Sequence, residues 1–168
     1  MKAVIVCVSE SHGNTRRVAQ AMGEVLDAPV VDPAELDPAA LAGYDLVGFG
    51  SGIFQMNFHR RLRDFVDALP HAPEGRSTRA FLLATSGLPE PRPVRYVRRL
   101  TRRVEAKGLP VLDAFTCRGF DTWAPFKPFG GLHKDRPHAG DLAAAQAFAQ
   151  GLRKLQEPPA RAGRRTAF

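Results

Sequence analysis

Apolar residues along this chain follow two different spacings. Several runs are almost continuously apolar, which is typical of central parallel strands covered on both faces. These runs predict strands at Ala3–Val8, Pro29–Val31, Tyr44–Gly50, Ala80–Thr85 and Leu109–Cys117. Between them, apolar residues recur at the three-and-four spacing of amphipathic helices. This second pattern predicts a brief helical turn at Asp37–Leu41 and helices at about Thr15–Leu26, Phe58–Leu69, Pro93–Lys107 and Asp141–Leu155.

The alternation of strands and helices predicts the fold class. It indicates right-handed βαβ units, and so an α/β domain with a doubly wound, five-stranded parallel sheet and helices on both faces. We expect this domain to span residues 1–156, followed by a basic, disordered tail at 157–168. Ligands of such sheets bind beyond the carboxyl ends of the strands. The loops after Val8, Gly50 and Thr85 should therefore converge on one crevice.

Length and composition narrow the class of protein. The chain has 168 residues, 44% of them hydrophobic, which is enough for one domain with its own core. No apolar run reaches the ~20 residues of a membrane span, and the first residues lack the apolar segment of a signal peptide. We therefore expect a cytoplasmic protein. Its two cysteines, Cys7 and Cys117, are expected to be reduced thiols buried in strands, although the sequence leaves a disulfide between them open.

The most informative segment lies where the first strand turns into the first helix. Ser9, Ser11, Asn14 and Thr15 supply short polar side chains there, and Gly13 permits close backbone approach. Free N–H groups and the helix dipole attract anions at such a junction. The segment lacks the lysine of a nucleoside triphosphate loop and the three glycines of a dinucleotide fingerprint, which favours a terminal monophosphate. The structural alternative is that Asn14 or Thr15 caps the helix and the serines form a turn.

Taken in order, the loops of this chain resemble those of the flavodoxin family. The matching segments are Ser9–Thr15, Gly48–Phe54, Thr85–Gly87, and Cys117–Thr122 with Gly130, Gly131 and Pro137. The resemblance covers roughly residues 4–152. It implies a flavodoxin-like fold with that family's strand order 2-1-3-4-5, non-covalently bound FMN, and one- or two-electron transfer.

Carried over to this sequence, the resemblance assigns three groups of cofactor-binding residues. The phosphate would be held by Ser9, Ser11, His12, Gly13, Asn14 and Thr15. One side of the isoalloxazine ring would be lined by Ser51, Gly52, Ile53 and Phe54, and the other by Thr85, Ser86 and Gly87. Phe54 is a candidate for stacking on the ring, with core packing as its alternative. His12 either adds a positive charge beside the phosphate or points to solvent.

The chain also departs from the family pattern. Cys7 stands where an aromatic residue is usual, His12 makes the first loop one residue longer, and the net charge is +7 although typical flavodoxins are acidic. The histidines show no metal-ligand spacing, so we identify no metal site and no catalytic residue. The only tryptophan, Trp123, either covers the flavin edge or anchors the loop 118–137, and we favour the anchor.

The predicted third helix has an unusually basic face. Arginines recur at helical spacing opposite its apolar side, at Arg95, Arg98, Arg99, Arg102 and Arg103. A solvated face accounts for this placement, but not for five arginines without acidic residues four positions away. Such a face would attract an acidic protein, polyphosphate or anionic lipid, so docking of a redox partner, acidic by this charge, stands beside the solvated face as a hypothesis. Nucleic acid is disfavoured because no aromatic residues are interleaved with the arginines.

Three functions are compatible with these observations. The leading hypothesis is a single-domain FMN protein that carries electrons or serves as the flavin subunit of a redox system. The first alternative is an FMN-dependent NAD(P)H or quinone reductase with a substrate site formed by residues 118–137. The second is a flavin-free module of the same fold that docks acidic partners through the arginine face.

Overall fold

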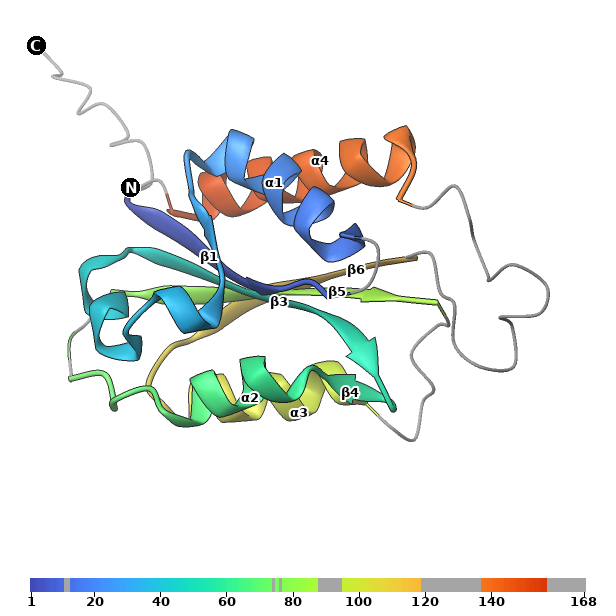
Figure 1. The fold of residues 1–168 in the computed structure, drawn as a ribbon. Coiled ribbons are helices and arrows are strands. Elements are labelled where there is room, and N and C mark those ends of the chain that lie inside the picture. Colours follow the sequence, from blue (N-terminus) through green and yellow to red (C-terminus); the bar gives the residue numbers. More distant parts are fainter. Residues whose placement is uncertain (11–12, 74, 76, 88–94, 119–136, 157–168) are drawn as a thin grey trace, which may run out of the picture.

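The computed structural model describes residues 1–10, 13–73, 75, 77–87, 95–118 and 137–156. A central sheet lies between two helical layers (Figure 1). Its strands are β1 (Ala3–Val8), β2 (Val30–Val31), β3 (Leu46–Phe54), β4 (Asn57–Phe58), β5 (Arg79–Ser86) and β6 (Val111–Arg118). The helices are α1 (Asn14–Leu26), α2 (Arg60–Asp67), α3 (Tyr96–Glu105) and α4 (Ala139–Gln156), with two short 3-10 helices, η1 (Pro33–Glu35) and η2 (Pro38–Gly43).

The sheet has the topology expected from the sequence. Its strands pair in the order β2-β1-β3-β5-β6, and all four of these pairings are parallel. The chain leaves β1 toward β2 on one side and returns to β3 on the other, so the strand order reverses between β1 and β3. We call the end of the sheet where β1, β3 and β5 finish the carboxyl edge, and the opposite end the amino edge (Figure 1).

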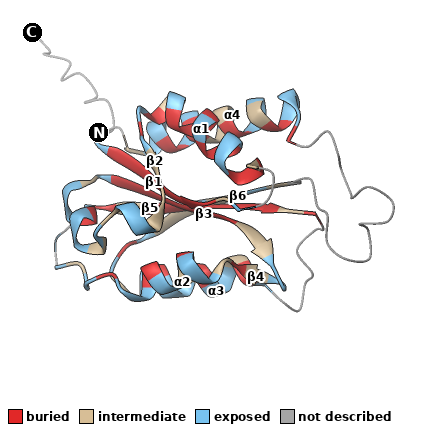
Figure 2. Cartoon of the chain, in the orientation of Figure 1, coloured by how far each residue is buried: buried red, intermediate tan, exposed pale blue. Residues whose placement is uncertain are grey.

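Burial on both faces explains the apolar runs. All six residues of β1 are buried, and successive side chains point to opposite faces of the sheet. Val4, Val6 and Val8 join the core cluster beneath α2 and α3, whereas Ile5 and Cys7 join the cluster beneath α1 and α4. The buried strands between two partly exposed helical layers are visible in Figure 2.

The third strand differs from its predicted form. β3 does not end at Gly50 but runs to Phe54, then folds back as β4, so the predicted helix start at Phe58 is also wrong. The two turn residues, Gln55 and Met56, have φ angles of 48° and 59°. Two left-handed residues are typical of a type I′ hairpin turn, which Asn and Gly usually form. Because neither residue is present here, the sequence carries no hairpin signal.

The later helices fit their predicted positions with shifted ends. α3 begins at Tyr96 after Arg95, whose φ is 42°, while the predicted start at Pro93 lies outside the described residues. The last helix, predicted from Asp141, begins at Ala139. The expected tail, 157–168, also lies outside the described residues. No helix in the described ranges has the length and apolar character needed to cross a bilayer.

The two cysteines form no disulfide and are too far apart to be linked. Cys7 in β1 and Cys117 in β6 are separated by β3 and β5. Three strand spacings of about 4.8 Å place them roughly 14 Å apart, beyond the ~4.4–6.8 Å between the Cα atoms of a disulfide. The disulfide is therefore excluded. Cys7 is buried as expected, and burial raises the pKa of its thiol to about 12, whereas Cys117 is only half-buried.

Candidate cofactor site at the carboxyl edge

The first β-to-α junction carries the residues expected to hold a phosphate. α1 begins at Asn14, and Gly13 before it is left-handed, with a φ of 68°. A Cβ added at Gly13 would meet nothing within 4 Å, so the backbone faces open space there. The N-cap residue is Gly13, which has no side chain, so the alternative in which Asn14 or Thr15 is the cap is wrong. The first turn also holds no acidic residue, so none of its side chains neutralises the positive end of the helix dipole.

Two buried threonines join the first junction to the third. The hydroxyl oxygens of Thr15 and Thr85 lie 2.7 Å apart, and the two residues are 3% and 6% exposed. One hydroxyl donates to the other, which leaves one hydroxyl proton and further lone pairs for another group. The pair therefore ties the first turn of α1 to the end of β5 while keeping hydrogen-bonding capacity for a ligand.

The end of β3 lies beside this pair. A Cβ added at Gly52 would lie 3.8 Å from the Thr15 hydroxyl oxygen and 3.1 Å from a ring carbon of Phe54. Ser51 is fully buried, and its hydroxyl donates to the Gly52 carbonyl at 2.7 Å and accepts from the His59 N–H at 2.9 Å. The Ser51 hydroxyl therefore fixes the local backbone, and Gly52 borders the threonine pair.

The β3–β4 hairpin exposes an aromatic ring at this edge. Phe54 is 39% exposed, and its ring forms a T-shaped pair with that of His59, with the centroids 5.3 Å apart. Ile53 is half-buried and pairs with Phe58 across the hairpin. Core packing therefore does not account for Phe54, which stays available for contact with a planar ligand.

Charged residues from three elements meet next to the hairpin. We call Glu10, Asp32, His59 and Arg61 the carboxyl-edge cluster. Glu10 lies 3.3 Å from His59 Nε2 and 3.7 Å from Arg61, which also pairs with Asp32. His59 Nδ1 accepts the Arg61 backbone N–H at 3.2 Å at the start of α2. This bond places the proton of a neutral His59 on Nε2, facing the Glu10 carboxylate.

The sequence analysis missed this cluster because its members lie far apart along the chain. Glu10 belongs to the first loop, Asp32 follows β2, and His59 and Arg61 belong to the start of α2. Their only sequence signal is a histidine beside the predicted helix start. The cluster connects the first loop to α2, and the bond from the His59 N–H to Ser51 continues this connection to β3.

The remaining expected residues are distributed as follows. The Ser9 hydroxyl accepts the Arg16 N–H at 3.2 Å, which holds it against the first turn of α1. Ser86 ends β5 half-buried, and Gly87 after it is buried. Ser11, His12 and Trp123 lie outside the described residues. The structure thus brings the first junction, the end of β3 and the end of β5 to one place, as the topology predicts.

This arrangement fits a ligand that has both an anionic group and a flat ring. The open left-handed backbone at Gly13 and the start of α1, where the N-cap residue has no side chain, suit an anion. The threonine pair supplies hydroxyl groups, and Phe54 supplies an exposed aromatic surface. Among the described residues, no cluster of His, Cys, Asp and Glu has the arrangement of a metal site.

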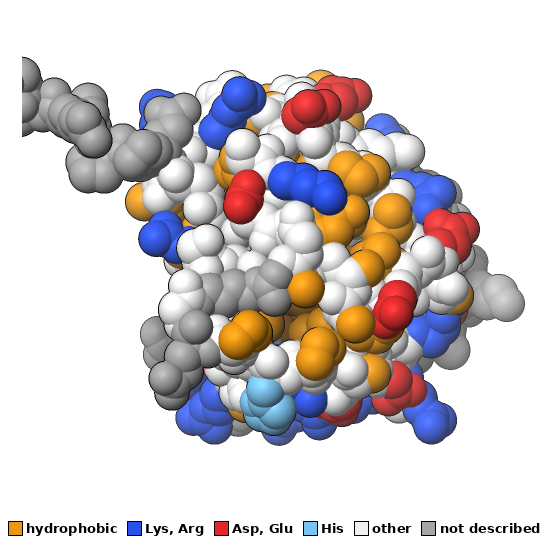
Figure 3. Space-filling model, turned by 90° about the vertical axis from the view of Figure 1, so that its left-hand side faces the viewer, with side chains coloured by type: hydrophobic (Ala, Val, Ile, Leu, Met, Phe, Trp, Pro, Cys, Tyr) orange, Lys and Arg blue, Asp and Glu red, His pale blue; other side chains and the backbone are white. Residues whose placement is uncertain are grey.

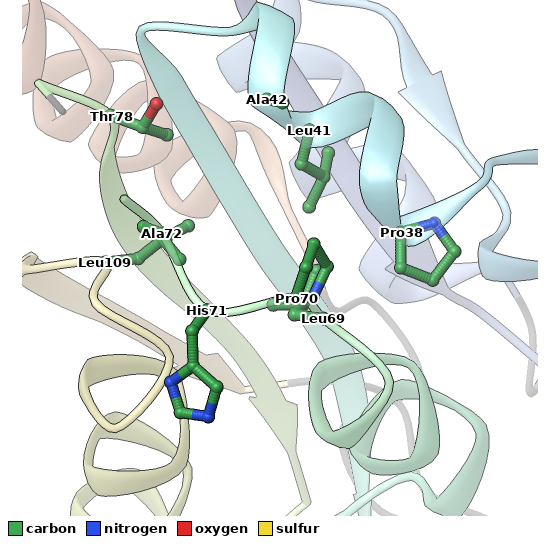
Figure 4. Close-up of a pocket in the computed structure, with 9 residues that line it drawn as sticks. All are labelled: Pro38, Leu41, Ala42, Leu69, Pro70, His71, Ala72, Thr78 and Leu109. Carbon is green, nitrogen blue, oxygen red and sulfur yellow. The ribbon is translucent and has the colours of Figure 1, made fainter. Parts of the chain in front are cut away.

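An apolar hollow opens at the opposite, amino edge (Figure 3). Its walls come from η2, the segment after α2, and the starts of β5 and β6. In the close-up, Leu41 points toward Pro70, while the ring of His71 points away from them (Figure 4). The cavity volume is about 30 Å³. This is the volume of roughly one water molecule and far below the ~300–1,000 Å³ of ligand pockets. The hollow therefore does not compete with the carboxyl edge as a cofactor site.

The sequence matches a known protein family. A sequence model of the flavodoxin domain matches residues 5–115. The uncharacterised protein MJ0298 of Methanocaldococcus jannaschii is 32% identical over 154 residues, which are 92% of this chain and 99% of that protein. This relative therefore matches along almost its whole length.

Comparison of the structure finds the same architecture. Flavodoxin 1 from Bacillus cereus superposes with a TM-score of 0.68 at 17% identity and covers 92% of this chain and 98% of its own. A flavodoxin from the domain Archaea has a TM-score of 0.66 at 15% identity, and the match covers 93% of this chain and 99% of that protein. An NADH:FMN oxidoreductase, EMOB, in its apo form has a TM-score of 0.61 at 17% identity, and the match covers 96% of this chain and 92% of that protein. These likenesses establish a flavodoxin-like α/β fold.

Proposed function

Because this chain belongs to the flavodoxin-domain family, we propose that it binds FMN without a covalent bond at the carboxyl edge. The observation that carries the proposal is the Thr15–Thr85 hydroxyl pair beside Gly52 and Phe54. It lies where the strand order reverses, which is where open α/β sheets bind their ligands. The solved relatives whose names include flavodoxin or FMN support the same choice.

In this proposal the phosphate of FMN lies at the first junction. Backbone N–H groups at the start of α1, with the dipole behind them, bind a dianion without a lysine. Hydrogen bonds to an ionised acceptor are about twice as strong as neutral ones. The residues assigned to the phosphate are Ser9, Ser11, His12, Gly13, Asn14 and Thr15.

The isoalloxazine ring would lie between the end of β3 and the end of β5. Ser51–Phe54 are assigned to one side of the ring and Thr85–Gly87 to the other. Phe54 stacks on the ring, and the bonds of Ser51 hold the adjoining backbone in place. Bound FMN supplies the redox chemistry, the transfer of one or two electrons.

We propose that the protein carries electrons between other proteins. The exposed position of Phe54 supports this role, because a ring seated beside it would have an edge near the protein surface. The alternative, an FMN-dependent NAD(P)H or quinone reductase, requires a substrate site above the ring. The fold shared with an NADH:FMN oxidoreductase keeps that alternative open to experiment.

An absorbance spectrum of the purified protein, followed by titration with FMN and with riboflavin, tests the proposal. We expect a flavin spectrum, or quenching of added FMN, and weaker binding of riboflavin because it lacks the phosphate. A colourless protein that takes up neither ligand would contradict both redox functions and favour the flavin-free module. If FMN binds, NAD(P)H oxidation with a quinone acceptor distinguishes the reductase from the carrier, which should turn over neither substrate by itself.

A further inference from the structure

The exposed face of α3 carries positive charge that the fold does not need. Arg98, Arg99 and Arg102 are exposed, whereas Tyr96 and Leu100 on the opposite side are buried. Arg98 and Arg102 are four residues apart, a spacing at which like charges repel within a helix. Cations near a helix N-terminus also oppose the helix dipole. Helix stability therefore does not explain the arginines of the first turns.

Internal ion pairs do not explain them either. Of the four arginines inside α3, Arg103 binds Asp67 of α2 at 2.7 Å. Arg98, Arg99 and Arg102 form no ion pair with any acidic residue in the described ranges. On α2, Arg60 pairs with Asp64 and Arg61 belongs to the carboxyl-edge cluster, whereas the half-buried Arg63 forms no ion pair in the described ranges. The exposed arginines of this layer that have no ion pair are therefore those of α3.

The opposite helical layer is less basic. α2 and α3 together hold seven arginines and three acidic residues, whereas α1 and α4 hold four basic and two acidic residues over a longer stretch of chain. The basic residues of α1 lie in its first turn and those of α4 in its last. A concentration of one charge on one face steers association with a surface of opposite charge.

The basic face adjoins the proposed cofactor site. The ring of Tyr96, in the first turn of α3, meets Phe58 of β4 edge-on, with the centroids 6.0 Å apart. β4 belongs to the hairpin that exposes Phe54 and, at its tip, Met56, which is 40% exposed. Figure 1 shows α3 and β4 on the same side of the sheet. A protein seated on Arg98 and Arg99 would therefore reach the hairpin as well.

We propose that the α3 arginines and the hairpin tip form a docking surface for an acidic redox protein. This inference rests on the proposed function, because it names the partner of the electron carrier. Arg98, Arg99 and Arg102 bind carboxylates of the partner, and Phe54 and Met56 supply the apolar contact that interfaces usually contain. A lipid surface fits less well, because the apolar side of α3 is buried in the core and is not free to enter a bilayer.

The test compares two charge-reversed variants that change the net charge by the same amount. Arg98→Glu with Arg102→Glu alters the proposed surface. Arg153→Glu with Lys154→Glu alters the end of α4, on the other side of the sheet, and serves as the control. In a stopped-flow instrument, chemically reduced acidic plant-type ferredoxin is mixed with each oxidised FMN-loaded protein, and each chemically reduced FMN-loaded protein is mixed with oxidised cytochrome c, a basic protein, for comparison, at increasing salt. Thermal unfolding confirms that both variants are folded.

We expect the wild-type rate with ferredoxin to fall at least about tenfold from low to high salt, because salt screens the attraction. At low salt the rate of the Arg98/Arg102 variant with ferredoxin should be at least about tenfold lower than that of the wild type. The α4 variant should keep more than about half of the wild-type rate. Equal losses in both variants would overturn the proposal, because net charge alone would then govern association. A wild-type rate with cytochrome c that falls as salt rises would overturn it as well, because repulsion between two basic surfaces predicts the opposite.

A binding measurement separates this inference from the proposed function. Anisotropy of a fluorescently labelled ferredoxin reports docking whether or not FMN is bound. If FMN does not bind but docking is lost in the Arg98/Arg102 variant alone, the redox function fails and the surface stands. Tighter binding to phosphatidylserine vesicles or to duplex DNA than to ferredoxin, lost in that same variant, would assign the face to lipid or nucleic acid and overturn the acidic protein partner.

Discussion

The two edges of the sheet are made by the same strands but use their polar groups differently. At the amino edge the Lys2 N–H donates to the Asp45 carboxylate at 2.6 Å, and the Thr78 hydroxyl donates to the Tyr44 carbonyl at 2.8 Å. Polar groups there secure the ends of the strands, and the hollow between them is apolar. At the carboxyl edge two threonine hydroxyls face each other and retain hydrogen-bonding capacity.

This difference shows how one sheet separates stability from binding. Groups whose bonds are complete within the chain add to the free energy of unfolding, but they have little left to offer a ligand. Groups that are held in place but keep an unused donor or acceptor can bind a ligand. If this separation holds, substitutions at the amino edge should change stability alone, and substitutions of the Thr15–Thr85 pair at the carboxyl edge should change mainly the affinity for FMN.

The largest expected effect is on stability, at the amino edge. Leu41 of η2 is 4% exposed and belongs to the core beneath α2 and α3. Leu41→Ala should lower the free energy of unfolding by about 2–5 kcal/mol, measured with urea, because it leaves a cavity. The FMN dissociation constant should stay within about twofold. Ala42→Ser, at an exposed neighbouring position, serves as the control. A matching loss of FMN affinity would show that the two edges are coupled.

The next effect is on binding, at the carboxyl edge. Thr15→Ala should weaken FMN binding by about 1–3 kcal/mol, because a buried hydrogen-bonding partner is lost. Riboflavin affinity should fall less if the hydroxyl serves the phosphate. Flavin fluorescence measures both constants. Thr101→Ala removes a threonine hydroxyl that bonds only within α3, and it should leave FMN affinity unchanged. Unaltered FMN affinity in Thr15→Ala would assign Thr15 to the helix start alone.

A third prediction concerns Cys7, in the core between the two edges. Burial favours the neutral thiol of Cys7 in the folded state and raises its pKa from the ordinary 9.0 to about 12. The stability that the neutral thiol contributes is therefore fully present below pH 9.0 and is lost as the pH rises toward 12. Within that window the free energy of unfolding should fall by about 1.4 kcal/mol per pH unit from this group. Urea unfolding at increasing pH should show a shallower decline in Cys7→Ala. Identical slopes in the two proteins would mean that Cys7 stays protonated in both states or is accessible when folded.

The smallest effect is expected in the carboxyl-edge cluster. Glu10 is half-exposed and faces two partners, so Glu10→Ala should cost about 0.2–1 kcal/mol of unfolding free energy. Asp64→Ala breaks the solvent-facing pair with Arg60 and should cost less, because only one partner is lost. Thermal unfolding at low and high salt compares the two variants. A larger loss in Asp64→Ala would show that the cluster does not stabilise the carboxyl edge.

The sequence was sufficient to predict the sheet, its helical layers and the convergence of three loops. Strands buried on both faces must be apolar throughout, so β1 and β5 were recognisable without any knowledge of their neighbours. Gly13 before α1 was expected to permit close approach of the backbone, and the structure shows it in the left-handed conformation. These features depend on residues that are close together in the sequence, so they can be recognised before the tertiary contacts are known.

The missed features depend on contacts between distant residues. Gly48 belongs to a motif assigned by resemblance to a flavin loop, but a Cβ there would lie 2.5 Å from the ring of Phe81, so this glycine is needed for core packing. The arginine face was expected to lack acidic partners within its own helix, and the partner of Arg103, Asp67, lies on the neighbouring helix. The contact between Glu10 and His59 likewise forms only once β1 and α2 are in place.

The bond between Thr15 and Thr85 has a consequence for biosynthesis. The two residues are 70 positions apart, so a nascent chain carries half of this pair until β5 has left the ribosome and joined β3. If FMN binds as proposed, its complete site therefore does not exist on the ribosome before that point.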